Sequence, residues 1–465
     1  MNLPNYFFAD LPPEAILSPT MIAAACDTLK RNREKYLLPR PTDELVKILC
    51  EVAAGWLAPE NHFRKLALER GPSETGFSRA VLQGGLDDFF RQFTLDNFNL
   101  LLEQELGHRQ RLDQFVTNGC EASSRTAMVH GPEFLVHIAA GNIPNPALMS
   151  LTLGLLTRSV QFVKCASGAS LLPRLFAHSI YHVDPKLGAC LEIAEWRGGH
   201  RELESVLFAH ANCLTATGGD ETLAAIRAHL PAKVRFLGYG QRVSFGFIAR
   251  EVLREETIAQ VVSRAADDVI AWDQHGCLSP HVLYVEERGA VESDKFVELL
   301  AVELMKREAD EPRGKISTAA AAIIASRRAI YETIAAHRAD AKIWSSQNST
   351  AWTVVFEHDV SFRFSCLNRF IYVKPVPDVA AVMRGVDEIH GKVSTVGLAA
   401  PPEKMQELAR QFARWGATRI CPLGQMQNPP LTWRHDGRPA LGDLVTWTDF
   451  EAGDGRLEMG VGNAP

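Results

Sequence analysis

The sequence of 465 residues lacks the features that mark secretion, a membrane span or nucleic-acid binding. Its start, MNLPNYFFADLPPEAI, has neither a basic segment nor an apolar core, so it does not predict a secretory signal. The most apolar stretch, LVHIAAGNIPNPALMSLTLGLL, is interrupted by two asparagines and two prolines, which a lipid-spanning helix tolerates poorly. The net charge of −6 and the isoelectric point near 6.2 do not suit a nucleic acid or an anionic membrane surface.

Cysteine is present, but without a pattern typical of disulfides or metal binding. The nine cysteines are scattered, odd in number and include no CxxC pair, which favours reduced thiols in the cytoplasm. Internal repeats and low-complexity segments are also missing. With 46% hydrophobic and 22% charged residues, the composition is ordinary, and the length requires two or three domains. We therefore expect a cytoplasmic enzyme with no bound metal.

Helical patterns dominate the first part of the chain. Apolar residues recur at helical spacing in SPTMIAAACDTLKRNREKYL, TDELVKILCEVAAGWLA and LDNFNLLLEQEL, each behind a residue suited to an N-cap. The segments YLLPRPTD and GPSETG predict turns between these helices. We expect residues 1–115 to form a helical region that packs on the next domain and carries no catalytic cluster.

From about residue 124, short apolar or β-branched runs alternate with helical segments, which is typical of a parallel α/β sheet. The first set of runs is TAMVHG, EFLVHIAA, SVQFVKCAS, ANCLTATGG and KVRFLGYG. A second set begins near residue 251 and includes HVLYVEE, TAWTVVFE and RFIYVKPV. The sequence thus predicts an α/β fold with one domain over 116–250, a second over 251–440 and a tail strand within 441–465.

One cysteine is placed differently from the other eight. The stretch WDQHGCLSPH sets Cys277 behind a glycine, between a helical pattern and the strand HVLYVEE, with His275 and His281 close in sequence. Such a turn can expose the sulfur and let local dipoles lower its pKa, as a nucleophilic thiolate requires. Most single cysteines are inert, so this motif alone does not establish a catalytic cysteine, and further motifs are required.

Three further turns fall where strands end and helices begin. AAGNIPN ends a strand with Asn142 before a proline-rich helix start, whose backbone amides suit an oxyanion. Lys164 ends the strand FVKC, at the edge where α/β folds bind nucleotides. Gly218 and Gly219 open a helix after the strand LTAT, in a turn that tolerates phosphate. Each signal alone also fits a cap, a surface charge or a plain loop.

In this order and spacing, the motifs resemble those of the aldehyde dehydrogenase superfamily. That family's oxyanion asparagine, ribose-binding lysine, pyrophosphate turn, ELGG segment and nucleophilic cysteine correspond to AAGNIPN, FVKCAS, ATGGDE, RFLGYGQ and QHGC. The phrases NREKYLLPRP, RFLGYGQRVSFG, WDQHGCLSPH and CPLGQMQNPPLTWRHDGRPAL are similar to one branch, the LuxC-type acyl-CoA reductases or fatty acid reductases. The resemblance covers residues from about 20 to 450. It implies two Rossmann-type lobes, a cofactor domain and a catalytic domain, with an oligomerisation hairpin near 124–138 that the tail strand joins.

The resemblance implies a reductase acting on an acyl-CoA or a carrier-bound acyl thioester. Cys277 would attack the thioester, Asn142 and the Cys277 backbone N–H would hold the oxyanion, and His281 or His275 would supply a proton. Oxidising relatives carry a glutamate that activates water, and this chain has Phe236 at that position. Without this base, the acyl group on the cysteine would persist until a hydride or a thiol takes it.

The resemblance also implies a nicotinamide cofactor, and we expect NADPH rather than NADH. Ser167 stands where NAD-preferring relatives have a glutamate that repels the 2′-phosphate. Lys164, with Arg174 further on, would then pair with that phosphate. The implied cofactor contacts are Ala139, Ala140, Gly141, Lys164, Ser167, Thr217, Gly218, Gly219, Thr222 and Gly238.

Two alternatives stay open at this point. The first is an oxidising aldehyde or semialdehyde dehydrogenase, which would oxidise an aldehyde with NAD(P)+ without added thiol. The second is a partner-binding subunit with a vestigial site, whose N-terminal helices dock an acyl-activating or carrier protein; its Cys277 would react no faster than the other thiols. The resemblance further implies a homo-oligomer, at least a dimer, and we expect neither a nucleic-acid partner nor a membrane span.

Overall fold

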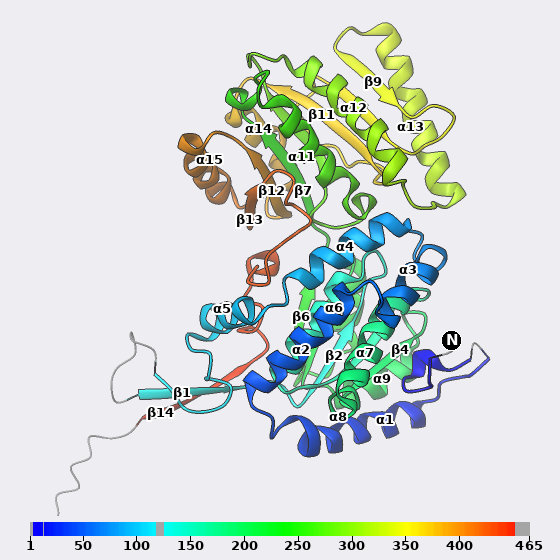
Figure 1. Ribbon diagram of the computed structural model, residues 1–465, viewed down its shortest axis with the longest axis vertical. Coiled ribbons are helices and arrows are strands. Elements are labelled where there is room, and N and C mark those ends of the chain that lie inside the picture. Colours follow the sequence, from blue (N-terminus) through cyan, green and yellow to red (C-terminus); the bar gives the residue numbers. More distant parts are fainter. Residues whose placement is uncertain (1–2, 13, 118–124, 452–465) are drawn as a thin grey trace, which may run out of the picture.

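The computed structural model describes residues 3–12, 14–117 and 125–451. Two lobes lie end to end along the longest axis of the molecule, and the N-terminal helices cover the lower one (Figure 1). Each lobe is built on a sheet flanked by helices, so the α/β architecture predicted from the alternating pattern is confirmed. In the described part of the chain, no helix combines the length and the apolar character that crossing a membrane requires.

The N-terminal region consists of helices whose starts carry side-chain caps. Ser18 Oγ accepts the Met21 N–H and Thr94 Oγ1 accepts the Asn97 N–H, as their sequence positions predict. These helices share one hydrophobic core with the first sheet. They are α1 (Pro19–Asn32), α2 (Thr42–Leu57), α3 (His62–Glu74), α4 (Arg79–Arg91) and α5 (Leu95–Leu106).

The predicted turn GPSETG is wrong in its first half. Helix α3 continues through Pro72 and ends at Glu74. A proline has no N–H, so the Leu68 carbonyl loses its partner one turn back. The Arg79 guanidinium donates to that carbonyl instead, at 3.3 Å. A long-range donor, invisible in the local pattern, thus lets the helix tolerate the proline.

The first sheet has five parallel strands in the order β4-β3-β2-β5-β6. Its order reverses between β2 and β5, and ligands of α/β sheets bind in the crevice at such a point. The strands are β2 (Phe134–Ile138), β3 (Val160–Cys165), β4 (Leu191–Glu195), β5 (Cys213–Thr217) and β6 (Arg235–Tyr239). The flanking helices are α6 (Asn145–Leu156), α7 (Leu171–Val183), α8 (Pro185–Gly188), α9 (Arg201–His210) and α10 (Asp220–His229).

The second sheet has seven strands in the order β13-β12-β7-β8-β11-β10-β9, and only β9 runs antiparallel to its neighbour. The strands are β7 (Val243–Ile248), β8 (Pro280–Glu286), β9 (Ala341–Ser345), β10 (Thr353–Glu357), β11 (Phe370–Val376), β12 (Val393–Ala399) and β13 (Arg419–Pro422). The helices are α11 (Ile258–Ile270), α12 (Ser293–Asp310), α13 (Thr318–His337), α14 (Val379–Gly385) and α15 (Pro402–Trp415).

The expected domain boundary at residue 250 lies too far along the chain. Strand β7 pairs with β8 and β12, so it belongs to the second lobe, and the crossing falls between Tyr239 and Val243. The sequence hides this strand because Gly246 interrupts its apolar run. A Cβ at Gly246 would stand 2.6 Å from the Leu283 side chain, so the close approach of neighbouring strands requires glycine there.

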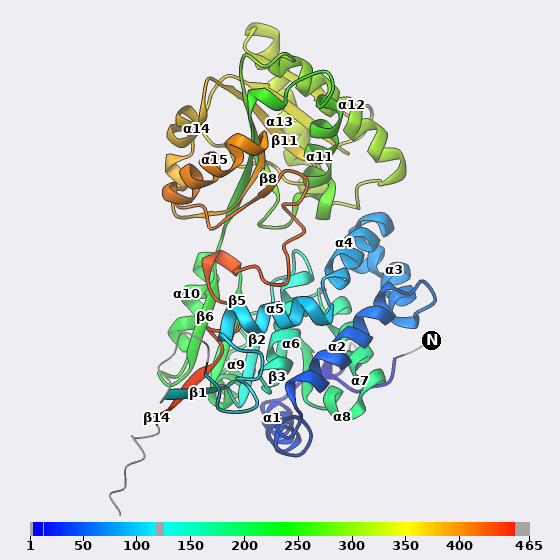
Figure 2. The ribbon, with the colours of Figure 1, turned by 60° about the vertical axis from the view of Figure 1, so that its left-hand side comes forward.

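A two-stranded arm projects from the lower lobe in both views (Figures 1 and 2). Strand β1 (Arg125–His130) pairs antiparallel with β14 (Thr446–Glu451), so the tail strand joins the segment where it was expected. The expected hairpin within 124–138 is wrong, because β2 leaves β1 and enters the parallel sheet. Residue 124 and the tail beyond residue 451 lie outside the described residues.

The chain crosses between the lobes a second time after β13. Leu431, Leu441, Leu444 and Val445 are buried in the core that the N-terminal helices share with the first sheet. The expected end of the catalytic domain at residue 440 is therefore also too late. The segment that passes back carries several residues of the cavity described next.

Candidate active site

The turn that carries Cys277 has an unusual backbone. Trp272, Asp273 and Gln274 have φ of 51°, 47° and 64°, a left-handed conformation that costs free energy in residues with a side chain. Surrounding contacts hold it in place. The Arg369 Nε lies 2.8 Å from Asp273 Oδ1, and the Asn368 N–H donates to the Asp273 carbonyl at 2.9 Å.

Cys277 itself is half-buried at the inner end of this turn. A Cβ at Gly276 would stand 2.3 Å from the Gln427 amide, so a larger residue there would displace the Gln427 side chain. The Ser244 hydroxyl donates to the Cys277 carbonyl at 2.8 Å and so holds the backbone of Cys277 against β7. Burial raises the pKa of the thiol to about 12, and the nearby Asp436 charge raises it further. The expected lowering of this pKa is therefore wrong: the turn presents the sulfur to a cavity, where a thiolate is poorly solvated.

That cavity has a volume of about 410 Å³ and receives side chains from both lobes. Helices α4 and α6 supply one side, and the end of α11, the cysteine turn and the returning segment supply the other. Its lining is more apolar than polar. The apolar lining residues include Val81, Phe89, Ile143, Met149, Leu153, Ile270, Leu278 and Leu431.

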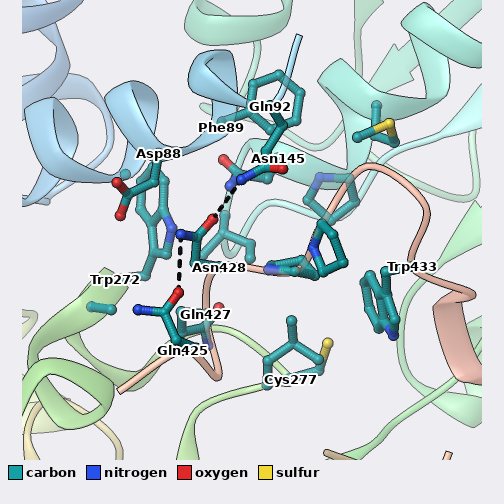
Figure 3. A pocket seen from close by; sticks show the side chains of 18 of the residues that line it. Asp88, Phe89, Gln92, Asn145, Trp272, Cys277, Gln425, Gln427, Asn428 and Trp433 are labelled. Carbon is teal, nitrogen blue, oxygen red and sulfur yellow. Dashed lines mark hydrogen bonds between the residues drawn. The ribbon is translucent and has the colours of Figure 1, made fainter. Parts of the chain in front are cut away.

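One wall of the cavity carries amides instead (Figure 3). The Gln92 amide donates to Asn428 Oδ1, and the Asn428 amide donates to Gln425 Oε1, both at 3.3 Å. Asn145, at the start of α6, also lines the cavity, and its Oδ1 has no hydrogen-bond partner among the described residues. The wall therefore offers polar contacts to part of a bound molecule.

Three carboxylates mark the part of the cavity that faces solvent. The side chains of Asp88, Asp267 and Glu311 line it and remain 49%, 42% and 38% exposed. Gly84 also lines the cavity, and a Cβ there would meet no atom within 4 Å. The neighbouring Gly85 differs, because a Cβ there would stand 2.1 Å from the Trp272 indole. The α4 face thus leaves room at Gly84 and none at Gly85.

Of the predicted site residues, Asn142 contacts the cysteine turn and Thr217 lines the same cavity as Cys277. The Asn142 Nδ2 donates to the His275 carbonyl at 2.8 Å, two residues before Cys277. Thr217 lies at the end of β5. The Gly218 N–H donates to the Tyr239 carbonyl at 3.2 Å, which ties this turn to β6.

The other expected cofactor residues lie at the same edge of the first sheet. Ala139, Ala140 and Gly141 follow β2, and the Ala139 N–H donates to the carbonyl of Lys164 at the end of β3. Burial lowers the pKa of Lys164. Of the remaining residues, Ser167 follows β3, Gly218 and Gly219 precede α10, Thr222 lies in α10, and Gly238 lies in β6.

Two expectations about the cofactor turn are wrong. Arg174 is not available for a phosphate, because its Nη1 donates to the Ala9 carbonyl at 2.6 Å and its Nε lies 3.7 Å from Asp10. A carboxylate also stands beside Ser167 after all: Glu195, from β4, accepts the Gly168 N–H at 2.7 Å. Contacts between distant segments caused both errors.

Neither histidine proposed as a proton donor faces the cavity. His281 packs against Phe362 and Phe364, and its Nδ1 accepts the Ser365 N–H at 3.1 Å. Burial lowers its pKa to about 4. His275 pairs through Nε2 with Asn368 Oδ1 at 2.9 Å. The proposed proton-donor role of His281 is therefore not supported by its position.

The sequence reasoning missed the residues that do reach the cavity from the returning segment. Trp433 and His435 line it together with Cys277 and Tyr239, and the charge of Asp436 acts on the thiol. No site residue is predicted from the sequence in the segment WRHDGRP. The adjacent histidine and aspartate were a usable signal, but nothing in the sequence brings them next to a cysteine more than 150 residues earlier.

Residues 37–447 match the family model described as "Acyl-CoA reductase (LuxC)". Over 357 residues the chain is 23% identical to "Long-chain acyl-protein thioester reductase 2" of Photobacterium leiognathi, covering 76% of this chain and 70% of that one. The PutA aldehyde dehydrogenase structure from Anabaena variabilis gives a TM-score of 0.69 at 15% identity, covering 94% of this chain and 93% of that one. A bifunctional proline utilization A protein gives 0.69 at 16% identity, covering 94% of this chain and 45% of that one. The structural matches confirm the aldehyde dehydrogenase-like fold.

Proposed function

Because the chain belongs to the acyl-CoA reductase (LuxC) family, we propose that it reduces an acyl thioester to an aldehyde with NADPH, through an acyl group held on Cys277. One observation carries the proposal: Cys277 and the Thr217 turn line a single, largely apolar cavity between the lobes. A similar protein is named as a long-chain acyl-protein thioester reductase, which supports the same reaction. Phe236 supports reduction over oxidation, since it brings no carboxylate to activate water.

The side chains around Cys277 account for the acyl transfer. The thiolate attacks the carbonyl carbon of the thioester and the carrier thiol leaves. The Asn142 amide has two N–H groups and gives one to the His275 carbonyl, so the second can donate to the oxyanion. The apolar lining excludes water from the acyl enzyme and so slows its hydrolysis.

The residues at the edge of the first sheet fit a dinucleotide. The turns after β2, β3 and β5 lie at the carboxyl ends of adjacent parallel strands, and a Cβ at Gly219 would meet no atom within 4 Å. Lys164 and Ser167 would hold the adenosine ribose and its 2′-phosphate, and the Thr217–Gly219 turn would hold the pyrophosphate. When bound, NADPH supplies the hydride that takes the acyl group to the aldehyde level.

The unaltered protein is expected to prefer NADPH over NADH by about tenfold. A charge-assisted contact from Lys164 to the 2′-phosphate contributes about 1.5–3 kcal/mol. The Glu195 carboxylate beside Ser167 offsets part of this gain. Ser167→Glu adds a second carboxylate beside Glu195 and should erase or reverse this preference. Lys164→Ala should weaken both cofactors, and Glu195→Gln should raise the NADPH preference. The measurement is kcat/KM with each cofactor. Equal values in the unaltered protein, or an unchanged ratio in Ser167→Glu, would contradict this assignment.

The acyl chain is expected to occupy the cavity beside α4. Val81 and Phe89 of α4 give this part of the cavity an apolar lining, and the carboxylates of Asp88, Asp267 and Glu311 are already paired with Arg91 or Arg307. This lining suits the apolar acyl chain. Gly84→Leu should therefore lower kcat/KM at least tenfold for long-chain substrates and little for short ones. Product analysis with NADPH and a series of acyl-CoAs from acetyl to hexadecanoyl tests both this path and the reaction itself.

Two results of that series would count against the proposal. Gln83, beside Gly84 and exposed, does not line the cavity, so Gln83→Leu is the matched control and should keep the chain-length profile. If Gly84→Leu lowers kcat/KM equally for substrates of every chain length, the acyl chain does not pass along α4. If the unaltered protein forms no aldehyde from any acyl-CoA or acyl-protein thioester, the proposed function itself is wrong.

We also propose that the β1–β14 arm joins copies of this chain. Phe115, Trp447 and Phe450 on and beside the arm are 45%, 45% and 55% exposed, which is unusual for large apolar side chains. Light scattering at micromolar concentration should show at least a dimer, and Trp447→Ser with Phe450→Ser should shift it toward the monomer. Ile323→Ser on α13, 57% exposed, is the control. A monomeric unaltered protein would overturn this proposal.

A further inference from the structure

The Cys277 thiol needs a base that the site described so far does not contain. Burial of the sulfur raises the pKa of the thiol and so disfavours the thiolate at neutral pH. Asn142 can stabilise an oxyanion, but an amide does not accept the thiol proton. A general base must therefore reach the same cavity.

His435 is placed to meet this need. It lines the cavity with Cys277 and lies beside two aromatic rings. Its ring stacks on Tyr239, with centroids 4.6 Å apart and an interplanar angle of 12°. The Trp433 ring lies 4.7 Å away at a tilt of 35°. These two contacts hold the imidazole in place. Burial lowers the His435 pKa below its ordinary value, so the ring is neutral at pH 7 and able to accept a proton.

Asp436 lies next to this ring and has one carboxylate oxygen without a hydrogen-bond partner among the described residues. Its side chain is 3% exposed, and this oxygen, Oδ1, lies 3.9 Å from His435 Nε2. The other oxygen lies 3.2 Å from the Arg242 Nε. Asp436 has a φ of 54°, a left-handed backbone conformation that residues with a side chain adopt at a cost in free energy. A buried carboxylate with an unpaired oxygen is stabilised when a positive charge forms beside it.

We propose that His435 is the general base that takes the proton from Cys277, and that Asp436 is the positioning residue that stabilises the imidazolium formed. This inference rests on the proposed function and assigns the proton transfers within it. The Cys277 Sγ–H proton moves to His435, and the thiolate forms a bond to the thioester carbonyl carbon. The bond to the carrier sulfur then breaks, and the imidazolium returns its proton to the departing carrier thiolate. No electrons are transferred in this half of the reaction, and His435 ends neutral.

The test is the single-turnover acylation of Cys277 by decanoyl-CoA without cofactor, followed by mass spectrometry from pH 5 to pH 9. The charges of Asp436, Arg242 and Arg438 act on His435, the Tyr239 ring stacks on it, and Cys277 lines the same cavity. In the unaltered protein the rate should fall as pH drops through the lowered His435 pKa, since the ring is then protonated. His435→Gln should lose about a hundredfold at pH 7. Its rate should instead rise about tenfold per pH unit with the thiolate.

Two further variants separate a chemical role from a structural one. In His435→Ala, added imidazole should restore acylation in proportion to its neutral form, because the space left beside the Tyr239 ring accepts a ring of the same size. Asp436→Asn should slow acylation at pH 7 and move the acid limb to lower pH, because the imidazolium loses its counter-charge. His281→Gln is the control, since that histidine is also half-buried but lies outside the cavity.

Several outcomes would overturn the inference. If His435→Gln is acylated at the same rate and with the same pH profile as the unaltered protein, His435 is not the base. If the decline in rate at low pH persists in His435→Gln but is lost in Asp436→Asn, Asp436 is the base. Failure of imidazole to rescue a folded His435→Ala contradicts a chemical role. Alkylation of Cys277 by iodoacetamide separates the two proposals. A His435-dependent alkylation profile without any acylation by thioesters would leave the base in place and reject the proposed function.

Discussion

Cys277→Ala is expected to abolish acyl labelling and to lower the rate of thioester reduction by on the order of 10⁴-fold or more. The reason is that Cys277 is the only cysteine among the described residues that line the cavity, and a thiolate is a far stronger nucleophile than the hydroxyl groups beside it. Cofactor binding should survive, because the expected contacts lie on the first sheet. Acylation by a radiolabelled or isotopically marked acyl-CoA, read by mass spectrometry, checks the covalent step, and aldehyde formation checks the whole reaction.

Two comparisons make this test specific. Cys277→Ser should be nearly as damaging as alanine, since a serine hydroxyl is a far weaker nucleophile than a thiolate near neutral pH. Cys366→Ala is the matched control, because Cys366 is also a half-buried free cysteine but does not line the cavity. Its loss should leave labelling and reduction unchanged. Retained acyl labelling in Cys277→Ala would remove Cys277 from its role.

Arg369→Met is expected to lower the free energy of unfolding by about 3–5 kcal/mol. The side chains of Arg369 and Asp273 are 1% and 4% exposed, so the variant would leave a carboxylate buried without its partner charge. Arg369 also pairs with Glu308 at 3.0 Å and donates to the Glu311 carbonyl at 2.7 Å. Urea titration measures the change. Because Asp273 holds the left-handed turn before Cys277, reduction should fall even where the variant is folded.

An exposed ion pair provides the control for this prediction. Lys295 and Glu298 pair at 2.9 Å with side chains 59% and 49% exposed, and Lys295→Ala should cost less than about 1 kcal/mol. If Arg369→Met lowers the free energy of unfolding by no more than Lys295→Ala does, the buried pair does not support the turn. Hydrogen exchange of residues 272–277 gives a local measure, since amides of a released turn exchange faster.

The fold could be predicted from sequence wherever a local pattern decided the structure. The alternation of short apolar runs and helices gave the two α/β lobes, and Ser18 and Thr94 marked the helix starts they cap. The prediction failed where a distant partner decided instead. Arg79 relieves the proline in α3, and the close packing of Leu283 explains the glycine that disguised β7.

The site residues could likewise be predicted where a local pattern marked them, and not where tertiary packing placed them. Turns at strand ends carry their own signal, which pointed to Asn142 and Thr217. In the structure Asn142 donates to the His275 carbonyl and Thr217 lines the cavity that contains Cys277. The burial of Cys277 and the contacts of Arg174 with the N-terminal segment depend on tertiary packing, and both were predicted wrongly. His435 reaches the cavity only because the chain returns to the first lobe after β13.

This return has a consequence for the order in which the protein folds during synthesis. The first lobe contains most of its strands by Tyr239, but its core is closed by Leu431, Leu441, Leu444 and Val445. At about 5–20 residues per second, the ~200 residues between these parts take about 10–40 s to leave the ribosome. During that interval the nascent first lobe exposes the apolar surface that these four residues later cover. A chaperone that binds apolar segments would therefore meet its substrate here before translation ends.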